Sequence, residues 1–79
     1  MSTVTLYTLP DCQQCRATKR KMDQLGINYE AIDLSEDHDA REYVLSLGYS
    51  AAPVVDAGGM TWQGYKPEWI QDLVPAQAA

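Results

Sequence analysis

Two cysteines separated by two residues are the side chains most able to do chemistry in this sequence. They are Cys12 and Cys15, and the chain holds no other cysteine. An apolar, β-prone run at 4–7 precedes them, and a helix-like segment follows them. The free N–H groups and the positive dipole end of a helix N-terminus favour a thiolate over a thiol. The pattern indicates dithiol–disulfide exchange, with Cys12 as the nucleophile and Cys15 as the resolving thiol.

A structural disulfide and a metal site are the alternative interpretations of the pair. Closing so short a loop stabilises a fold by only about 2 kcal/mol in the chain-entropy model, and scaffold disulfides usually come in sets. A zinc site needs about four ligands, and the one histidine, His38, lies on a different expected helix. Redox chemistry is favoured over both, and it requires neither a metal ion nor a cofactor bound to the chain.

Length and composition indicate one small folded domain. The chain has 79 residues, of which 46% are hydrophobic, and its formal net charge is −5 at pH 7. That acidic balance argues against general binding to nucleic acid or to an anionic membrane. Neither a signal peptide nor a transmembrane stretch is recognisable in the sequence. We therefore expect a cytoplasmic monomer that forms one domain over residues 1–79, with a frayed tail at 75–79.

Hydrophobic periodicity predicts the elements that position the cysteines. Alternating patterns predict strands at 3–8, 27–34, 52–55 and 60–63. Spacings of three and four predict helices at 13–25 and 37–47, and a last helix that begins at Pro67. The first two strands should form a parallel βαβ unit, and the last two an antiparallel hairpin. The strand at 3–8 should be central, because both of its faces carry apolar side chains.

Helix ends and faces follow from particular residues of the sequence. Ser35 or Asp37 should cap the second helix, and glycines should end the first two helices. The second helix should bury a stripe of side chains at helical spacing, namely Ala40, Tyr43, Val44 and Leu47.

The order β-α-β-α-β-β-α, with Cys-x-x-Cys after the first strand, resembles the thioredoxin fold in its minimal, glutaredoxin-sized form. This fold is a four-stranded mixed sheet flanked by three helices. Within it, three segments are similar to the NrdH-redoxin family: Cys12-Gln13-Gln14-Cys15, Ala51-Ala52-Pro53-Val54-Val55 and Trp62-Gln63-Gly64-Tyr65-Lys66-Pro67. The third is similar to the family signature Trp-Ser-Gly-Phe-Arg-Pro. The resemblance covers nearly the whole chain.

The resemblance implies a thiol–disulfide oxidoreductase that binds no cofactor. It implies that electrons come ultimately from NADPH through thioredoxin reductase, and pass to the large subunit of class Ib ribonucleotide reductase. It also implies a cis Ala52–Pro53 bond that faces the cysteines and leaves the backbone of Ala52 free to pair with an extended partner segment. A trans proline that starts an edge strand also fits the sequence.

Several residues near the cysteines are predicted to contact protein partners. Pro10 enforces the turn before Cys12. Arg16 opposes the helix dipole in the first turn, which suggests thiolate stabilisation or contact with an acidic partner, whereas the basic run at 19–21 is a solvated face or a docking patch. Trp62 is a core residue or part of a docking surface, and the resemblance implies a hydrogen-bonded network around its loop. The predicted partner-binding residues are Pro10, Gln13, Gln14, Arg16, Ala52, Pro53, Trp62, Gly64, Tyr65 and Lys66.

Two other functions compete with this interpretation. Glutathione-dependent glutaredoxins commonly have a lysine where this chain has Leu9, and an acidic segment where it has residues 64–68. Both features hold the charged ends of glutathione, so their absence disfavours a glutathione carrier. In a metal-binding or iron–sulfur module, two chains would share four cysteines.

Overall fold

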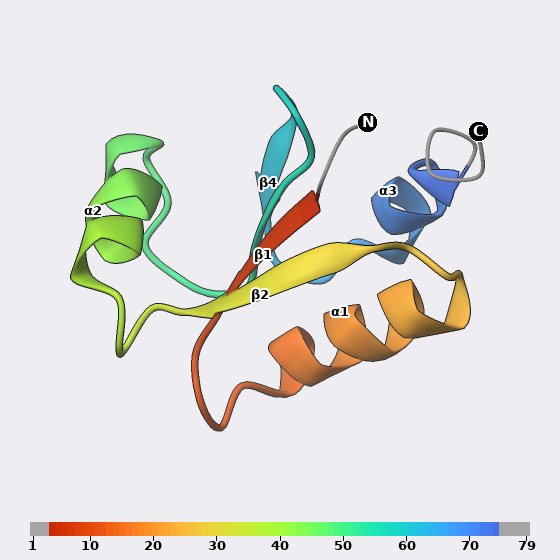
Figure 1. The fold of residues 1–79 in the computed structure, drawn as a ribbon, viewed down its shortest axis with the longest axis horizontal. Helices are drawn as coiled ribbons and strands as arrows, with labels where there is room; N and C mark the ends of the chain where they lie inside the picture. The colour runs from red at the N-terminus through yellow and green to blue at the C-terminus, as the bar shows by residue number, and fades with distance from the viewer. Residues whose placement is uncertain (1–3, 75–79) are drawn as a thin grey trace.

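The computed structural model describes residues 4–74 as a four-stranded mixed sheet with helices on both faces (Figure 1). The elements are β1 (Val4–Thr8), α1 (Gln13–Gln24), β2 (Tyr29–Asp33), α2 (His38–Ser46), β3 (Val54–Asp56), β4 (Thr61–Gln63) and α3 (Pro67–Gln71). This is the order predicted from the sequence. None of the described helices is long and apolar enough to cross a membrane. The predicted tail at 75–79 lies outside the described residues.

Strand β1 lies inside the sheet, where it pairs with β2 in parallel and with β3 antiparallel; β3 and β4 form the antiparallel hairpin. The predicted central position of β1 is therefore confirmed. Its side chains alternate between two cores. Leu6 packs in one core with Met22 of α1 and Ile70 of α3, and Tyr7 packs in the other with Val44 of α2. Figure 1 shows α2 on one side of the sheet and the other two helices on the opposite side.

Helix α1 ends in a hydrogen-bonded cap that determines where β2 can begin. Gly26 has a φ of 70°, its N–H donates to the Asp23 carbonyl, and the N–H of Ile27 donates to the Met22 carbonyl at 3.0 Å. This is the Schellman arrangement, in which a glycine takes the left-handed conformation. Ile27 is held in the cap and packs against Met22, so β2 begins at Tyr29 rather than at the predicted residue 27.

The second helix buries less of its surface than the sequence predicts. Val44 is the buried residue of α2, whereas Tyr43 and Leu47 are 41% and 36% exposed. The Tyr43 ring lies 5.9 Å from the Tyr7 ring, and its hydroxyl donates to Asp56 Oδ2 at 2.7 Å. This hydrogen bond raises the pKa of Tyr43. The bond to Asp56 holds the Tyr43 hydroxyl at the surface. The predicted inward stripe is therefore wrong at Tyr43 and at Leu47.

Asp37 caps α2, and its replacement by alanine should destabilise the protein by about 1 kcal/mol. Its Oδ1 accepts a hydrogen bond from the N–H of Ala40 at 3.0 Å, whereas the hydroxyl of Ser35 donates to Asp33. Urea unfolding of Asp37→Ala, with Glu36→Ala as the matched control, measures the effect. Equal unfolding free energies for the two variants would contradict the capping role.

Candidate redox site

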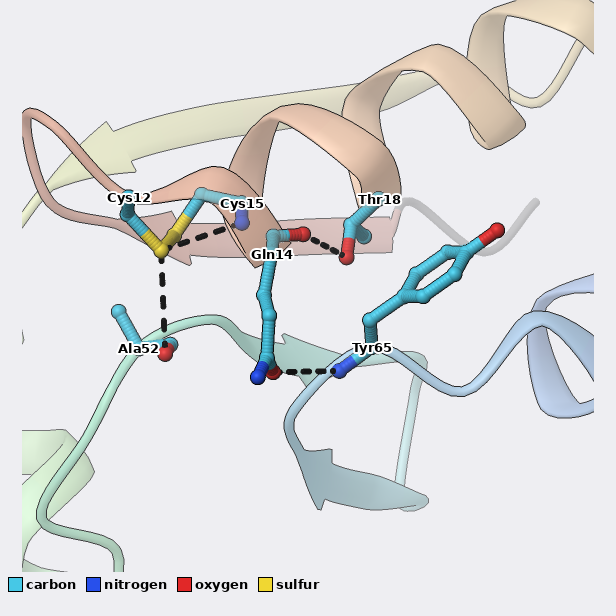
Figure 2. The surroundings of a disulfide bond; sticks show 6 residues. All are labelled: Cys12, Gln14, Cys15, Thr18, Ala52 and Tyr65. Carbon is cyan, nitrogen blue, oxygen red and sulfur yellow. Dashed lines mark hydrogen bonds between the residues drawn. A yellow bond between two sulfur atoms is a disulfide. The ribbon is translucent and has the colours of Figure 1, made fainter.

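The two cysteines form a disulfide at the first turn of α1, with their Cα atoms 5.2 Å apart (Figure 2). Cys12 is the N-cap residue of α1 and is half-buried, whereas Cys15 is 2% exposed. The N–H of Cys15 donates to Cys12 Sγ at 3.1 Å. A backbone donor at a helix N-terminus stabilises negative charge on that sulfur once the disulfide is reduced. Both the accessibility and the donor favour Cys12 as the attacking thiol.

A tight turn at Pro10 and Asp11 delivers Cys12 from β1 to α1. Asp11 has a φ of 58°, in the left-handed region that few residues other than glycine adopt. Aspartate tolerates this region better than most residues, because its short polar side chain can hydrogen-bond locally. The turn at Pro10 is the one predicted from the sequence, whereas the left-handed conformation of Asp11 was not predicted. The Pro-Asp pair, a common turn dipeptide, was the available signal.

The loop before β3 faces the cysteines across the site. The Ala52–Pro53 peptide bond is cis, as the resemblance implied, and the carbonyl oxygen of Ala52 lies 3.9 Å from Cys12 Sγ. Pro53 is fully buried, and Ala52 is half-buried. Figure 2 shows Ala52 directly opposite the sulfur of Cys12. The structure thus brings together the cysteine pair and the loop predicted to present backbone groups to a partner.

The segment after β4 joins the two walls of the site by hydrogen bonds. The N–H of Gly64, whose φ is 92°, donates to the Pro53 carbonyl at 2.7 Å. The N–H of Tyr65 donates to Oε1 of Gln14 at 3.2 Å, and Figure 2 shows this side chain extending from α1 to the loop. Gln14 therefore holds the loop, although the side chains of both Gln13 and Gln14 are exposed. The sequence did not distinguish the two glutamines.

Comparison with known proteins places this architecture in a family. The glutaredoxin family model matches residues 4–62 of the chain. The glutaredoxin-like protein NrdH of Escherichia coli strain K12 is 41% identical over 76 residues, which cover 96% of this chain and 94% of that protein. The chain belongs to the NrdH-redoxin family of glutaredoxin-like proteins. The glutaredoxin-like protein NrdH of Lactococcus lactis strain IL1403 is 29% identical and covers 89% of this chain and 97% of its own length.

The solved structure of E. coli NrdH-redoxin matches the fold with a TM-score of 0.87. The two chains are 39% identical, and the match covers 90% of this chain and 93% of the other. That protein is described as glutaredoxin-like with a thioredoxin-like activity profile. The thioredoxin-like fold predicted from the sequence is thereby confirmed. As a member of the NrdH-redoxin family with a Cys12–Cys15 disulfide, the chain is a thiol–disulfide oxidoreductase and a dithiol redox carrier.

Of the two roles that the sequence left open for Trp62, core or docking surface, the structure of this NrdH-redoxin shows the core. Trp62 is 2% exposed, and its Nε1 has no hydrogen-bond partner within residues 4–74. Side chains alternate along β4, so Trp62 faces the core between the sheet and α3, while Gln63 points to the other face. An exposed docking role for Trp62 is therefore wrong, and glutamine side chains rather than the indole form the loop network.

Trp69 is the surface aromatic of this region, at 40% exposure. The Trp62 ring contacts it nearly edge-on, with centroids 5.4 Å apart. Lys66 Nζ lies 4.3 Å from the Trp69 ring centroid, so a cation–π contact holds this lysine over the ring. The predicted binding residue Lys66 thus lies over an exposed aromatic ring.

The predicted basic patch is not uniform in its surroundings. Arg16 and Arg20 are exposed, and Lys19 and Lys21 are half-buried. Hydrogen bonds from Ser35 lower the pKa of Asp33, and the charge of Lys19 adds a smaller lowering. Lys19 therefore acts on a carboxylate of the protein itself. Arg16 stays the candidate for contact with an acidic partner.

A cavity of about 220 Å³ lies on the α2 side of the disulfide. Its lining is largely apolar and includes Leu9, Leu34, Arg41, Val44, Leu45 and Ala52. Ala52 contacts Cys12 as well, so the cavity adjoins the redox site.

Within the part of the chain that the structure describes, no group of three or more histidine, cysteine, aspartate or glutamate residues is placed to hold a metal ion.

Proposed function

We propose that this redoxin carries electrons from NADPH, through thioredoxin reductase, to the large subunit of a class Ib ribonucleotide reductase. The observation that carries the proposal is an exchangeable disulfide at a helix N-terminus, beside the cis-proline loop of an NrdH-like scaffold. The thioredoxin-like activity profile described for the E. coli relative supports thioredoxin reductase as the donor. The proposed compartment is the cytoplasm, where thiols are kept reduced.

The reaction consists of two successive thiol–disulfide exchanges. The Cys12 thiolate attacks one sulfur of the partner disulfide, forms a mixed disulfide and expels the first partner thiolate, which takes a proton from solvent. The Cys15 thiolate then attacks Cys12 Sγ, forms the Cys12–Cys15 disulfide and releases the second partner thiolate. Two electrons reach the partner. The reductase restores both thiols with two electrons from NADPH, so we propose that the chain itself holds no cofactor.

Two features of the site support thioredoxin reductase over glutathione as the electron source. Leu9 places an exposed apolar side chain where glutaredoxins commonly carry the lysine that holds a glutathione carboxylate. The N–H of Tyr65, in the loop where the acidic segment is missing, already donates to Gln14. Neither the Leu9 side chain nor the N–H of Tyr65 supplies a charge to the ends of the tripeptide.

The proposal is tested by following NADPH oxidation in two reconstituted systems that share a protein-disulfide acceptor. One supplies thioredoxin reductase, and the other supplies glutathione with glutathione reductase. We expect rapid NADPH oxidation only in the first, and deoxyribonucleotide formation when a class Ib ribonucleotide reductase replaces the acceptor. Reduction through glutathione alone would make the protein a glutathione-dependent glutaredoxin instead.

A further inference from the structure

The side chain of Gln63 connects the end of β4 to the loop that precedes the cis-proline. Its Oε1 accepts hydrogen bonds from the N–H groups of Ser50 and Ala51, each at 3.1 Å. Gln63 is 12 and 13 residues away from these partners along the chain. Segment 49–53 has no regular secondary structure. A side chain, rather than a strand ladder, therefore satisfies these two backbone donors.

The contacts of Gln63 and Gly64 flank Ala52. Gln63 holds the two residues before Ala52, and the N–H of Gly64 holds the carbonyl of the residue after it, Pro53. Between these fixed points, the carbonyl of Ala52 lies 3.9 Å from Cys12 Sγ. Residues of β4 and the loop after it thus set the position of Ala52 opposite the reactive sulfur. Within residues 4–74, the Gln63 side chain forms no hydrogen bond with either cysteine.

We propose that Gln63 is a positioning residue that holds the 50–52 loop ready to pair with an extended segment of a protein partner. The inference rests on the proposed function, in which Ala52 offers its backbone to a protein disulfide. Pairing with a mobile loop requires that the loop be ordered at the moment of binding, which weakens affinity. A loop already held by two hydrogen bonds avoids most of that loss.

If Gln63 positions the loop, the reduction of protein disulfides should depend on Gln63 more than the reduction of small disulfides does. A protein partner has a main chain that can add to the Ala52 segment, whereas a small aromatic disulfide has none and needs only access to Cys12. Removal of the Gln63 acceptor should therefore weaken the reaction with proteins and leave the intrinsic reactivity of the thiol nearly unchanged. In the family signature, serine stands at this position, a shorter side chain with a hydroxyl in place of the amide.

The test compares three variants with dithiothreitol as the electron source. Gln63→Met keeps the length of the side chain and removes the oxygen acceptor, while Gln63→Glu restores an acceptor for both N–H groups. Gln24→Met is the matched control, because Gln24 is exposed at the end of α1 and has no side-chain hydrogen bond within residues 4–74. Reduction of insulin is measured with dithiothreitol present. The reaction of each pre-reduced variant with 5,5′-dithiobis(2-nitrobenzoate) is measured after dithiothreitol has been removed, because dithiothreitol reduces that disulfide directly. Amide exchange at Ser50 and Ala51 is followed in the same variants.

For Gln63→Met we expect kcat/KM for insulin to fall about tenfold, mainly through KM, as the loss of two ordinary hydrogen bonds predicts. The rate with the small disulfide should change less than about twofold, amide exchange at the two residues should accelerate, and Gln63→Glu should recover most of the insulin activity. Equal losses with both disulfides, or no loss with insulin, would overturn the proposal. Because dithiothreitol replaces the reductase, a failure of thioredoxin reductase to reduce the protein would refute the proposed electron source alone.

Discussion

Replacement of Cys12 by serine should abolish disulfide reduction, whereas replacement of Cys15 by serine should leave a covalent mixed disulfide with the partner. Cys12 is the more accessible sulfur and accepts the backbone N–H at the start of α1. Cys15 is buried behind it and is placed to attack the mixed disulfide from within the protein. Without a thiol at position 15, the first exchange can proceed and the second cannot.

Non-reducing electrophoresis and mass spectrometry of the variants with an oxidised protein substrate distinguish these outcomes. The Cys15→Ser sample should contain an adduct with the combined mass of the redoxin and its substrate, and dithiothreitol should cleave it. The Cys12→Ser sample should contain no such adduct. The wild-type protein, treated in parallel, controls for non-specific oxidation. Retained turnover in Cys12→Ser, or an adduct formed through Cys15, would reverse the assignment of attacking and resolving thiols.

Replacement of Trp62 by alanine should destabilise the fold by about 3–5 kcal/mol, the range for removing a large aromatic side chain from a core. Trp62 is 2% exposed and packs with Leu6, Val55 and Ile70. Domains of this kind are stable by only about 5–15 kcal/mol, so the substitution removes a large part of the total. The indole also supports Trp69, and through it the Lys66 contact at the surface.

Trp62→Phe is the matched variant for this prediction. It keeps an aromatic ring in the core and removes the Nε1–H, which has no hydrogen-bond partner among residues 4–74. An unsatisfied buried donor costs about 1–3 kcal/mol, so its removal should offset part of the lost packing. Urea unfolding should place Trp62→Phe much closer to the wild type than Trp62→Ala. A surface role for Trp62 would instead leave both variants within about 0.5 kcal/mol of the wild type.

Local features of the sequence determined the order of the strands and helices and the position of the redox site. Alternation in β1 and the three-and-four spacing of Cys15, Thr18 and Met22 predicted the first strand and helix, and Gly26 predicted where that helix ends. These properties depend on neighbours within about one turn of helix or along one strand, which is the range that periodicity reports. The position of Cys-x-x-Cys at a helix start followed directly.

The tertiary structure decided which residues hold the site together. Gln14 meets a backbone group 51 residues away, and Gln63 meets two that lie 12 and 13 residues away. The burial of Trp62, the exposure of Tyr43 and the position of Ala52 opposite Cys12 likewise depend on how β4, α2 and the cis-proline loop pack on the sheet. A single sequence carries no periodic signal for such contacts, because they join side chains to backbone groups that only the folded chain brings together.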